Sequence, residues 1–104
     1  MANARLEALK SMVAQSPGDS FLRYGLAMEY RNSGDLESAM GEFQTLMNAA
    51  PDYTATYFHA GQTLERMGKL EEARQVYQTG IEVTGRKGDQ HARGELQGAL
   101  ELLG

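Results

Sequence analysis

An internal repeat is the feature that most restricts how this chain can fold. The segment that begins at Gly34 recurs from Gly68, so the repeat period is about 34 residues, a length found in helical repeat proteins. Six positions are identical between the two segments: Gly34/Gly68, Leu36/Leu70, Glu37/Glu71, Ala39/Ala73, Gln44/Gln78 and Thr45/Thr79. In the same frame one aromatic residue, Phe43, matches another, Tyr77. A unit of this size cannot bury its apolar face alone, so we expect the two copies to stack on each other.

Apolar residues inside each unit follow the period of an α-helix. In residues 36–48 they recur at i, i+3, i+4 and i+7, which places them on one face of a helix. This stripe consists of Leu36, Ala39, Met40, Phe43, Leu46 and Met47, and the second unit carries Leu70, Ala73, Val76, Tyr77 and Ile81. Another helical pattern precedes each stripe, in residues 20–32 and 54–67. Each unit is therefore predicted to be a pair of helices, and no segment shows a convincing strand pattern.

Glycine and aspartate residues mark the ends of these predicted helices. Gly34 and Gly68 stand where the first helix of each pair must end, and glycine accepts the left-handed conformation of a helix cap there. Asp19, Asp35 and Asp52 stand before predicted helices, where a carboxylate accepts hydrogen bonds from free backbone N–H groups. The loops left between the helices are short, so neighbouring helices are expected to be antiparallel.

Two more helices are predicted to flank the repeats. Residues 3–15 and 89–103 each carry leucines at helical spacing, and Pro17 ends the first of these segments. Pro17 also lies one repeat period before Pro51, so the repeat frame extends towards the N-terminus. The prediction is a single all-α domain of antiparallel helix hairpins over residues 1–104. It consists of a truncated repeat at 3–18, full repeats at 20–53 and 54–87, and a capping helix at 89–103.

The period and several residues resemble the tetratricopeptide repeat family, whose unit is also about 34 residues long. The first unit has Leu26, Ala27, Tyr30, Ala39, Phe43 and Pro51, and the second has Ala60, Gly61, Leu64, Ala73 and Tyr77, at the family's Leu-Gly, Tyr, Ala, aromatic and Pro positions. The resemblance covers residues 20–85. Departures from the family pattern are Arg23 at the usual Trp position, which Tyr57 fills in the second unit, Leu46 and Gly80 at a later Ala position, and Gly85 at the closing Pro. The resemblance implies a right-handed stack of helix pairs with a concave face.

The resemblance also places a partner-binding surface on the first helix of each pair, because these helices line the concave face, which usually binds peptides or protein segments. Helix 20–32 carries a second apolar line opposite its core stripe, with Phe21, Tyr24 and Met28 at i, i+3 and i+7. One buried stripe is enough for a helix at a protein edge, so the second line is expected to meet another molecule. Aromatic and methionine side chains supply apolar contact, and arginine supplies charge-assisted hydrogen bonds to a partner carboxylate. The candidate partner-binding residues are Phe21, Tyr24, Met28, Arg31, Asn32, Phe58, Gln62, Glu65 and Arg66.

Two alternatives stay open for this surface. The rings of Phe21, Tyr24 and Phe58 could pack on the flanking helices and on each other, which would fill the groove. The surface could also serve self-association as a homodimer, because a stack of two repeats leaves its ends open and a symmetric dimer would cover them. A clamp for a C-terminal carboxylate, as in chaperone-binding members of the family, is not expected, since Tyr24 and Met28 stand where polar side chains are needed.

Composition and motifs argue against other classes of function. The formal net charge of −4 disfavours nucleic acid and anionic membranes as partners, because both require a basic surface. Cysteine is absent and the two histidines, His59 and His91, are far apart, so no metal site, cofactor or catalytic centre is predicted. No run approaches the ~18 apolar residues of a membrane span, and the N-terminus lacks a signal peptide's apolar stretch, so a cytoplasmic location is expected. The chain is interpreted as a protein–protein interaction module and not as an enzyme.

Overall fold

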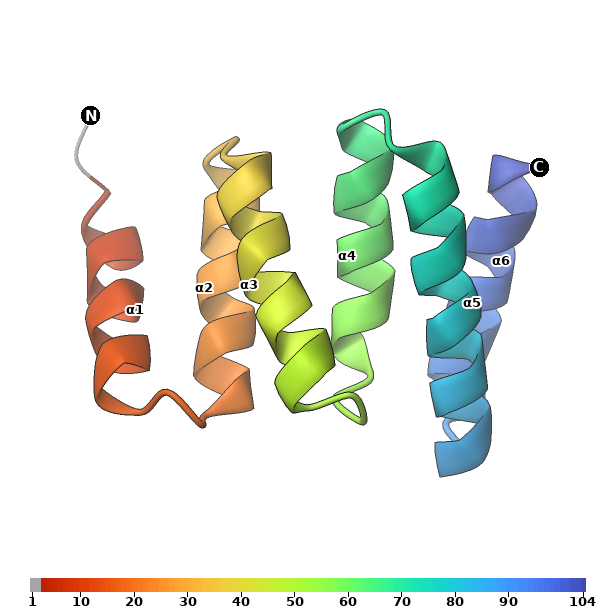
Figure 1. The fold of residues 1–104 in the computed structure, drawn as a ribbon, viewed down its shortest axis with the longest axis horizontal. Coiled ribbons are helices and arrows are strands. Elements are labelled where there is room, and N and C mark those ends of the chain that lie inside the picture. Colours follow the sequence, from red (N-terminus) through yellow and green to blue (C-terminus); the bar gives the residue numbers. More distant parts are fainter. Residues whose placement is uncertain (1–2) are drawn as a thin grey trace.

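The computed structural model describes residues 3–104, and this part of the chain contains six helices and no strand. The helices are α1 (Ala4–Gln15), α2 (Ser20–Asn32), α3 (Leu36–Ala49), α4 (Ala55–Arg66), α5 (Leu70–Lys87) and α6 (Gln90–Leu103). Consecutive helices are antiparallel and lie side by side. Helices α3 and α5 lie nearer the viewer than α2 and α6 (Figure 1). The prediction of an all-α fold built from antiparallel helix hairpins is therefore confirmed.

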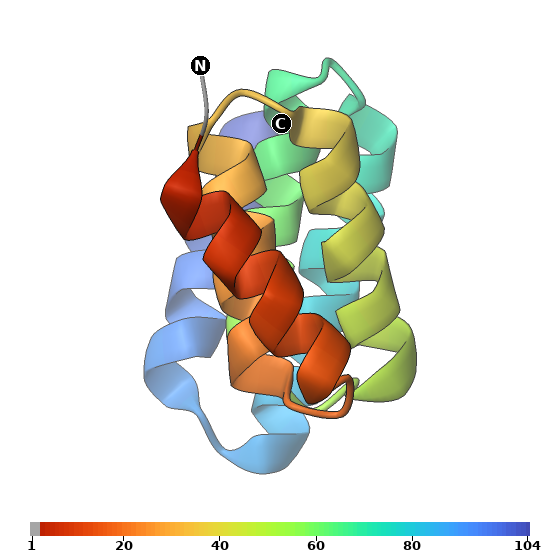
Figure 2. The ribbon, with the colours of Figure 1, turned by 90° about the vertical axis from the view of Figure 1, so that its left-hand side faces the viewer.

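The helices form two layers. Seen from the α1 end, α3 and α5 lie on one side of the stack, while α2 and α6 lie on the other with α4 between them (Figure 2). Each helix packs on the next one in the chain, and α4 also packs on α6. The first helices of the two pairs, α2 and α4, thus share a layer with α6, and their outward side is the face on which the sequence places the candidate site.

The apolar stripes of the helices meet in two adjoining core clusters. One lies between α2, α3 and α4 and consists of Ala27, Ala39, Phe43, Leu46 and Ala60. The other lies between α4, α5 and α6 and consists of Tyr57, Leu64, Ala73, Tyr77, Val83, Leu96 and Ala99. Ala39 and Ala73, which are one repeat period apart, are both 0% exposed. The two alanines hold equivalent buried positions, each in the hairpin of its own repeat.

The ends of the helices follow most of the predicted caps. Gly34 and Gly68 adopt left-handed φ angles of 88° and 78° after the first helix of each pair. Asp19 caps α2 by accepting a hydrogen bond from the backbone N–H of Leu22 at 3.1 Å. Asp35 caps α3 in the same way through the backbone N–H of Ser38, also at 3.1 Å.

The predicted cap at Asp52 is wrong. The residue before α4 is Thr54, which makes no side-chain capping bond. In the repeat register Tyr53, and not Asp52, matches Asp19, and the backbone N–H groups of both Asp19 and Tyr53 donate to a carbonyl three residues earlier, at 3.0 Å. An aromatic residue therefore replaces the capping aspartate in the repeat register, and Asp52 lies in the turn before Tyr53.

The departure from the family pattern at Arg23 has a local explanation. Tyr57, its counterpart in the second repeat, donates its hydroxyl to the carbonyl oxygen of Pro51 at 2.5 Å. Arg23 makes the equivalent contact, because its guanidinium donates to the carbonyl oxygen of Pro17 at 3.2 Å. Arg23 also forms an ion pair with Glu42 of α3 at 2.7 Å. A long side chain with a hydrogen-bond donor at its tip thus meets the requirement of this position in both repeats.

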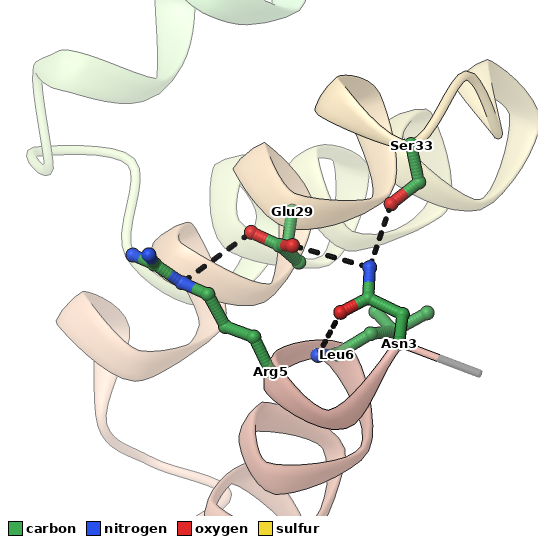
Figure 3. Close-up of polar contacts among 5 residues, drawn as sticks. All are labelled: Asn3, Arg5, Leu6, Glu29 and Ser33. Atoms are coloured by element: carbon green, nitrogen blue, oxygen red, sulfur yellow. Dashed lines mark hydrogen bonds and ion pairs between the residues drawn. The ribbon is translucent and has the colours of Figure 1, made fainter. Parts of the chain in front are cut away.

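Helix α1 packs on α2, and Val13 of α1 is buried. Polar contacts at the N-terminus of α1 add to this apolar contact. Asn3 caps α1 through the backbone N–H of Leu6 at 3.0 Å, and its amide donates to Glu29 at 3.2 Å and to Ser33 at 3.0 Å (Figure 3). The guanidinium of Arg5 lies 3.4 Å from the other carboxylate oxygen of Glu29. The carboxylate of Glu29 on α2 therefore accepts a hydrogen bond from Asn3 and forms an ion pair with Arg5.

Candidate functional site

A line of rings crosses from α2 to α4 on the face of the first helices. The ring of Tyr24 meets His59 edge-on at 5.7 Å between centroids, and His59 meets Phe58 edge-on at 5.5 Å. Tyr24 also contacts Tyr53 at 5.8 Å and the core residue Phe43 at 6.5 Å. Tyr24 is therefore half-buried and joins the two repeats, and burial raises the pKa of its hydroxyl, with Tyr53 adding to the effect.

His59 stands at the centre of this line, although sequence reasoning did not place it in the site. Its Nδ1 lies 3.4 Å from Nη1 of Arg31, and because a guanidinium can only donate, a hydrogen bond here requires Nδ1 to be the acceptor. Burial lowers the pKa of His59, and Arg31 lowers it further, while Glu95 of α6 acts in the opposite direction. The residue that matches His59 in the first repeat is Gly25, so the repeat pattern carried no signal for a ring at this position.

Arg31 brings a positive charge to the same face. No ion pair joins it to any described carboxylate within 4.0 Å, and its Nε is buried without a hydrogen-bond partner in the described part of the chain. The only side chain within hydrogen-bond distance of its guanidinium among residues 3–104 is the ring of His59. Arg31 is therefore a cation that a partner carboxylate can neutralise.

Two of the candidate residues, Gln62 and Glu65, have partners inside the molecule. The hydroxyl of Tyr77 donates to the carboxylate of Glu65 and accepts a hydrogen bond from the amide of Gln62 at 3.1 Å. Burial raises the pKa of Tyr77, and the bond to Glu65 raises it further. In the first repeat the matching residues are Phe43, Met28 and Arg31. Phenylalanine has no hydroxyl, so Met28 and Arg31 are free of this internal role.

The remaining candidates differ in exposure. Phe21 is 70% exposed, and Asn32 and Arg66 are exposed at the last residue of α2 and of α4 respectively. Met28 is half-buried against the core of the first repeat. The structure thus gathers Tyr24, Arg31 and Phe58 around His59 and leaves Phe21 outside this cluster. As the alternative of a filled groove expects, Tyr24 and Phe58 pack inside the molecule, whereas Phe21 does not.

A hollow of about 290 Å³ opens beside this cluster, between the N-terminal halves of α4 and α6. Its lining residues are Thr54, Ala55, Phe58, His59, Asp89, Ala92, Glu95 and Leu96. Four of these eight residues are apolar, and the two charged residues among them, Asp89 and Glu95, are both acidic. Such a hollow suits an apolar or basic side chain better than an acidic one.

A larger groove of about 510 Å³ lies in the other layer of helices, between α3 and α5. Its walls include Met40, Met47 and Val76, which the sequence pattern assigned to the core stripes and which the structure leaves half-buried. Sequence reasoning did not predict this second groove, because a helical stripe does not show which of its members are fully covered.

Comparison with known proteins identifies the family. The family model of the tetratricopeptide repeat matches residues 54–85. The TPR repeat-containing protein PA0015 of Pseudomonas aeruginosa is 31% identical over 98 residues, which are 94% of this chain and 93% of that protein. The chain belongs to the tetratricopeptide repeat family. Tetratricopeptide repeats are generally scaffolds for protein–protein interaction and generally lack catalytic activity, as the sequence resemblance implied.

Solved tetratricopeptide repeat structures show the same fold. A tetratricopeptide repeat domain protein from Salinibacter ruber has a TM-score of 0.78 and 36% identity, over 82% of this chain and 94% of that one. Protein BPP2914 from Bordetella parapertussis has a TM-score of 0.83 and 28% identity, over 98% of this chain and 89% of that one. The type III secretion translocator chaperone SycD from Yersinia enterocolitica has a TM-score of 0.86 over 94% of this chain and 68% of that one. At 18% identity, SycD supports the fold alone.

The described part of this tetratricopeptide repeat domain has neither a cluster of metal-ligating side chains nor a membrane-spanning helix. Within residues 3–104, no three His, Asp or Glu side chains gather where they could hold a metal ion. Across the same residues, no helix is both long enough and apolar enough to cross a membrane.

Proposed function

We propose that the face formed by α2, α4 and α6 binds a segment of a partner protein. The observation that carries this proposal is the arrangement around His59. The rings of Tyr24 and Phe58 flank His59, and His59 contacts Arg31, a cation without a carboxylate partner in the described chain. Half-buried aromatic rings beside an unneutralised arginine have the chemistry of an interaction hot spot. This arrangement extends a general property of the family to particular residues of this chain.

The charges on this face favour one orientation of the guest. Arg31 lies on α2, while Glu95 and Asp89 lie beside the hollow between α4 and α6. A guest that places a carboxylate at Arg31 and a basic or apolar side chain in the hollow satisfies both ends of the face. Complementary charges at the two ends contribute mainly to specificity and to the rate of association.

The test uses a library of random linear peptides, displayed on phage and selected on the purified full chain. Selected peptides are synthesised, and their affinity is measured by titration calorimetry for the wild type and for Glu95→Lys. The matched control is Glu101→Lys, which makes the same charge change at an exposed site on α6 outside the hollow. We expect Glu95→Lys to weaken binding by about tenfold and Glu101→Lys to leave it nearly unchanged. Equal affinities for all three proteins would contradict the proposal.

Self-association is a second candidate, and the exposure of two large apolar side chains favours it. Phe21 is 70% exposed and Met12 is 47% exposed, on α2 and α1 respectively. A symmetric dimer would cover such side chains. Sedimentation equilibrium of the wild type and of Phe21→Ser distinguishes the two functions. A monomer at all concentrations excludes the dimer, whereas a dimer that Phe21→Ser dissociates supports it.

A further inference from the structure

The groove between α3 and α5 lies on the layer opposite the proposed peptide-binding face, so it is independent of that function. Its volume is about 510 Å³, and its floor is formed by core residues of α4 such as Tyr57 and Leu64. Met40 and Met47 of α3 and Val76 of α5 are half-buried against the core and line the groove. Methionine is flexible and polarisable, so a wall of this kind can adapt to an apolar guest.

Two charged residues of α5 mark the ends of the groove. Glu72 lies in the first turn of α5 and Arg86 in its last turn, and both line the groove. The rise from Glu72 to Arg86 corresponds to about 21 Å along a helix, or about four turns. Neither residue forms an ion pair within the described chain, whereas the neighbouring Glu71 pairs with Arg74. The groove therefore has an acidic end and a basic end, and between them Met40, Met47 and Val76 stand among the polar side chains of Gln44, Gln75 and Thr79.

This distribution matches the ordinary chemistry of an amphipathic helix. Helices favour acidic residues in their first turn and basic residues in their last turn, because of the helix dipole. A guest helix satisfies Arg86 with its acidic N-terminus and Glu72 with its basic C-terminus only when it runs antiparallel to α5. We propose that the groove between α3 and α5 binds such a helix from a partner protein, about four turns long, with its apolar face on Met40, Met47 and Val76.

A second copy of this chain is the less suitable occupant. Helix α5 itself has acidic residues in its first turn and basic residues in its last turn, so an antiparallel pair of α5 helices would match in charge. Gln75 and Thr79, which line the groove, and Glu82 are exposed and polar, however, so α5 of a second copy offers no apolar stripe to the methionines. The guest must bring apolar side chains at i, i+3, i+4 and i+7, together with charges at its two ends.

The test selects helical peptides on the full chain, from a library with a fixed apolar stripe and random residues in the first and last turns. The variant Glu72→Arg/Arg86→Glu exchanges the charges of the groove without altering the net charge. The matched control is Glu82→Arg/Lys87→Glu, which exchanges two exposed charges of α5 that do not line the groove. Circular dichroism melts establish that both variants are folded before peptides are compared.

We expect peptides selected on the wild type to be acidic at the N-terminus and basic at the C-terminus. The exchange variant should bind them about tenfold more weakly and select the opposite charge order, while the control variant should behave as the wild type. The methyl resonances of Met40, Met47 and Val76 should shift when peptide is added. Selection without a charge order, equal affinity for the exchange variant, or methyl shifts confined to α2, α4 and α6 would overturn the proposal. Shifts of the same methyl groups with protein concentration alone would overturn it in favour of a second copy.

Discussion

The ring of Tyr77 on α5 lies so close to the backbone of Gly61 on α4 that no side chain fits between them. A Cβ atom built on Gly61 would overlap Cε1 of Tyr77. The matching pair in the first repeat is Ala27 and Phe43, so the larger ring of the second repeat coincides with the smaller residue opposite. The same ring carries its hydroxyl on to Gln62 and Glu65. Gly61, Gln62, Glu65 and Tyr77 therefore form one structural set that differs as a group from its counterpart in the first repeat.

Gly61→Ala is expected to destabilise the fold by about 1–3 kcal/mol, because the added methyl group overpacks a well-filled core and the ring of Tyr77 must move. Urea unfolding followed by circular dichroism measures the change. Gly98→Ala is the control, since a Cβ at Gly98 on α6 would meet no other atom within 4 Å. That variant should gain about 0.5–1 kcal/mol from the better helix propensity of alanine. Two variants of equal stability would show that Tyr77 does not pack as described.

Tyr77→Phe is expected to lower stability by about 1–2 kcal/mol near pH 7, because Glu65 and Gln62 lose their partner at the hydroxyl. The variant should also change the response to alkali. Burial and Glu65 raise the pKa of Tyr77 in the folded state, so the folded chain keeps this proton at a pH where the unfolded chain loses it. Stability should therefore fall as pH rises above about 10, the ordinary pKa of tyrosine. Urea unfolding at several alkaline pH values should show a shallower fall for Tyr77→Phe than for the wild type.

The fold was largely predictable because the two repeats carry the same sequence pattern. Ala39 and Ala73 mark equivalent buried sites, and Gly34 and Gly68 mark equivalent helix ends, so agreement between the copies reinforces each assignment. Errors arose where the copies differ. The sequence suggested Asp52 as a cap because it is an aspartate after a proline. The residue before α4 is instead Thr54, and the repeat register matches the capping Asp19 with Tyr53.

The candidate site was less predictable, because its geometry depends on contacts between helices. Helical spacing correctly placed Tyr24 and Phe58 on one face, but it could not show that His59 lies between their rings. Nor could it show that Gln62 and Glu65 are bonded to Tyr77, a residue on a different helix. Side-chain partners across helices are set by the approach of one helix to another, and a single-helix pattern contains no such information.

Ala39→Leu and Ala73→Leu are each expected to destabilise the fold by about 1–3 kcal/mol, because both alanines are 0% exposed and a larger side chain must displace its neighbours. Thermal unfolding of the two single variants measures the effect. Ala8→Leu on α1 serves as the control, since Ala8 is exposed and a leucine there has room in solvent. If both core variants melted at the temperature of the wild type, the packing of the two hairpins would differ from the structure.

His59 should make stability depend on acid. Burial and Arg31 lower its pKa in the folded state, so below about pH 6.5, the ordinary pKa of histidine, the unfolded chain binds a proton that the folded chain resists. Stability is therefore fully present above this pH and falls as the pH decreases towards the folded pKa. His59→Gln should flatten the fall between about pH 6.5 and 5. Melting temperatures across this range, with an NMR titration of the imidazole of His59, check the prediction. A wild-type curve that coincided with that of His59→Gln would mean that Arg31 and the surrounding rings exert no such influence on this imidazole.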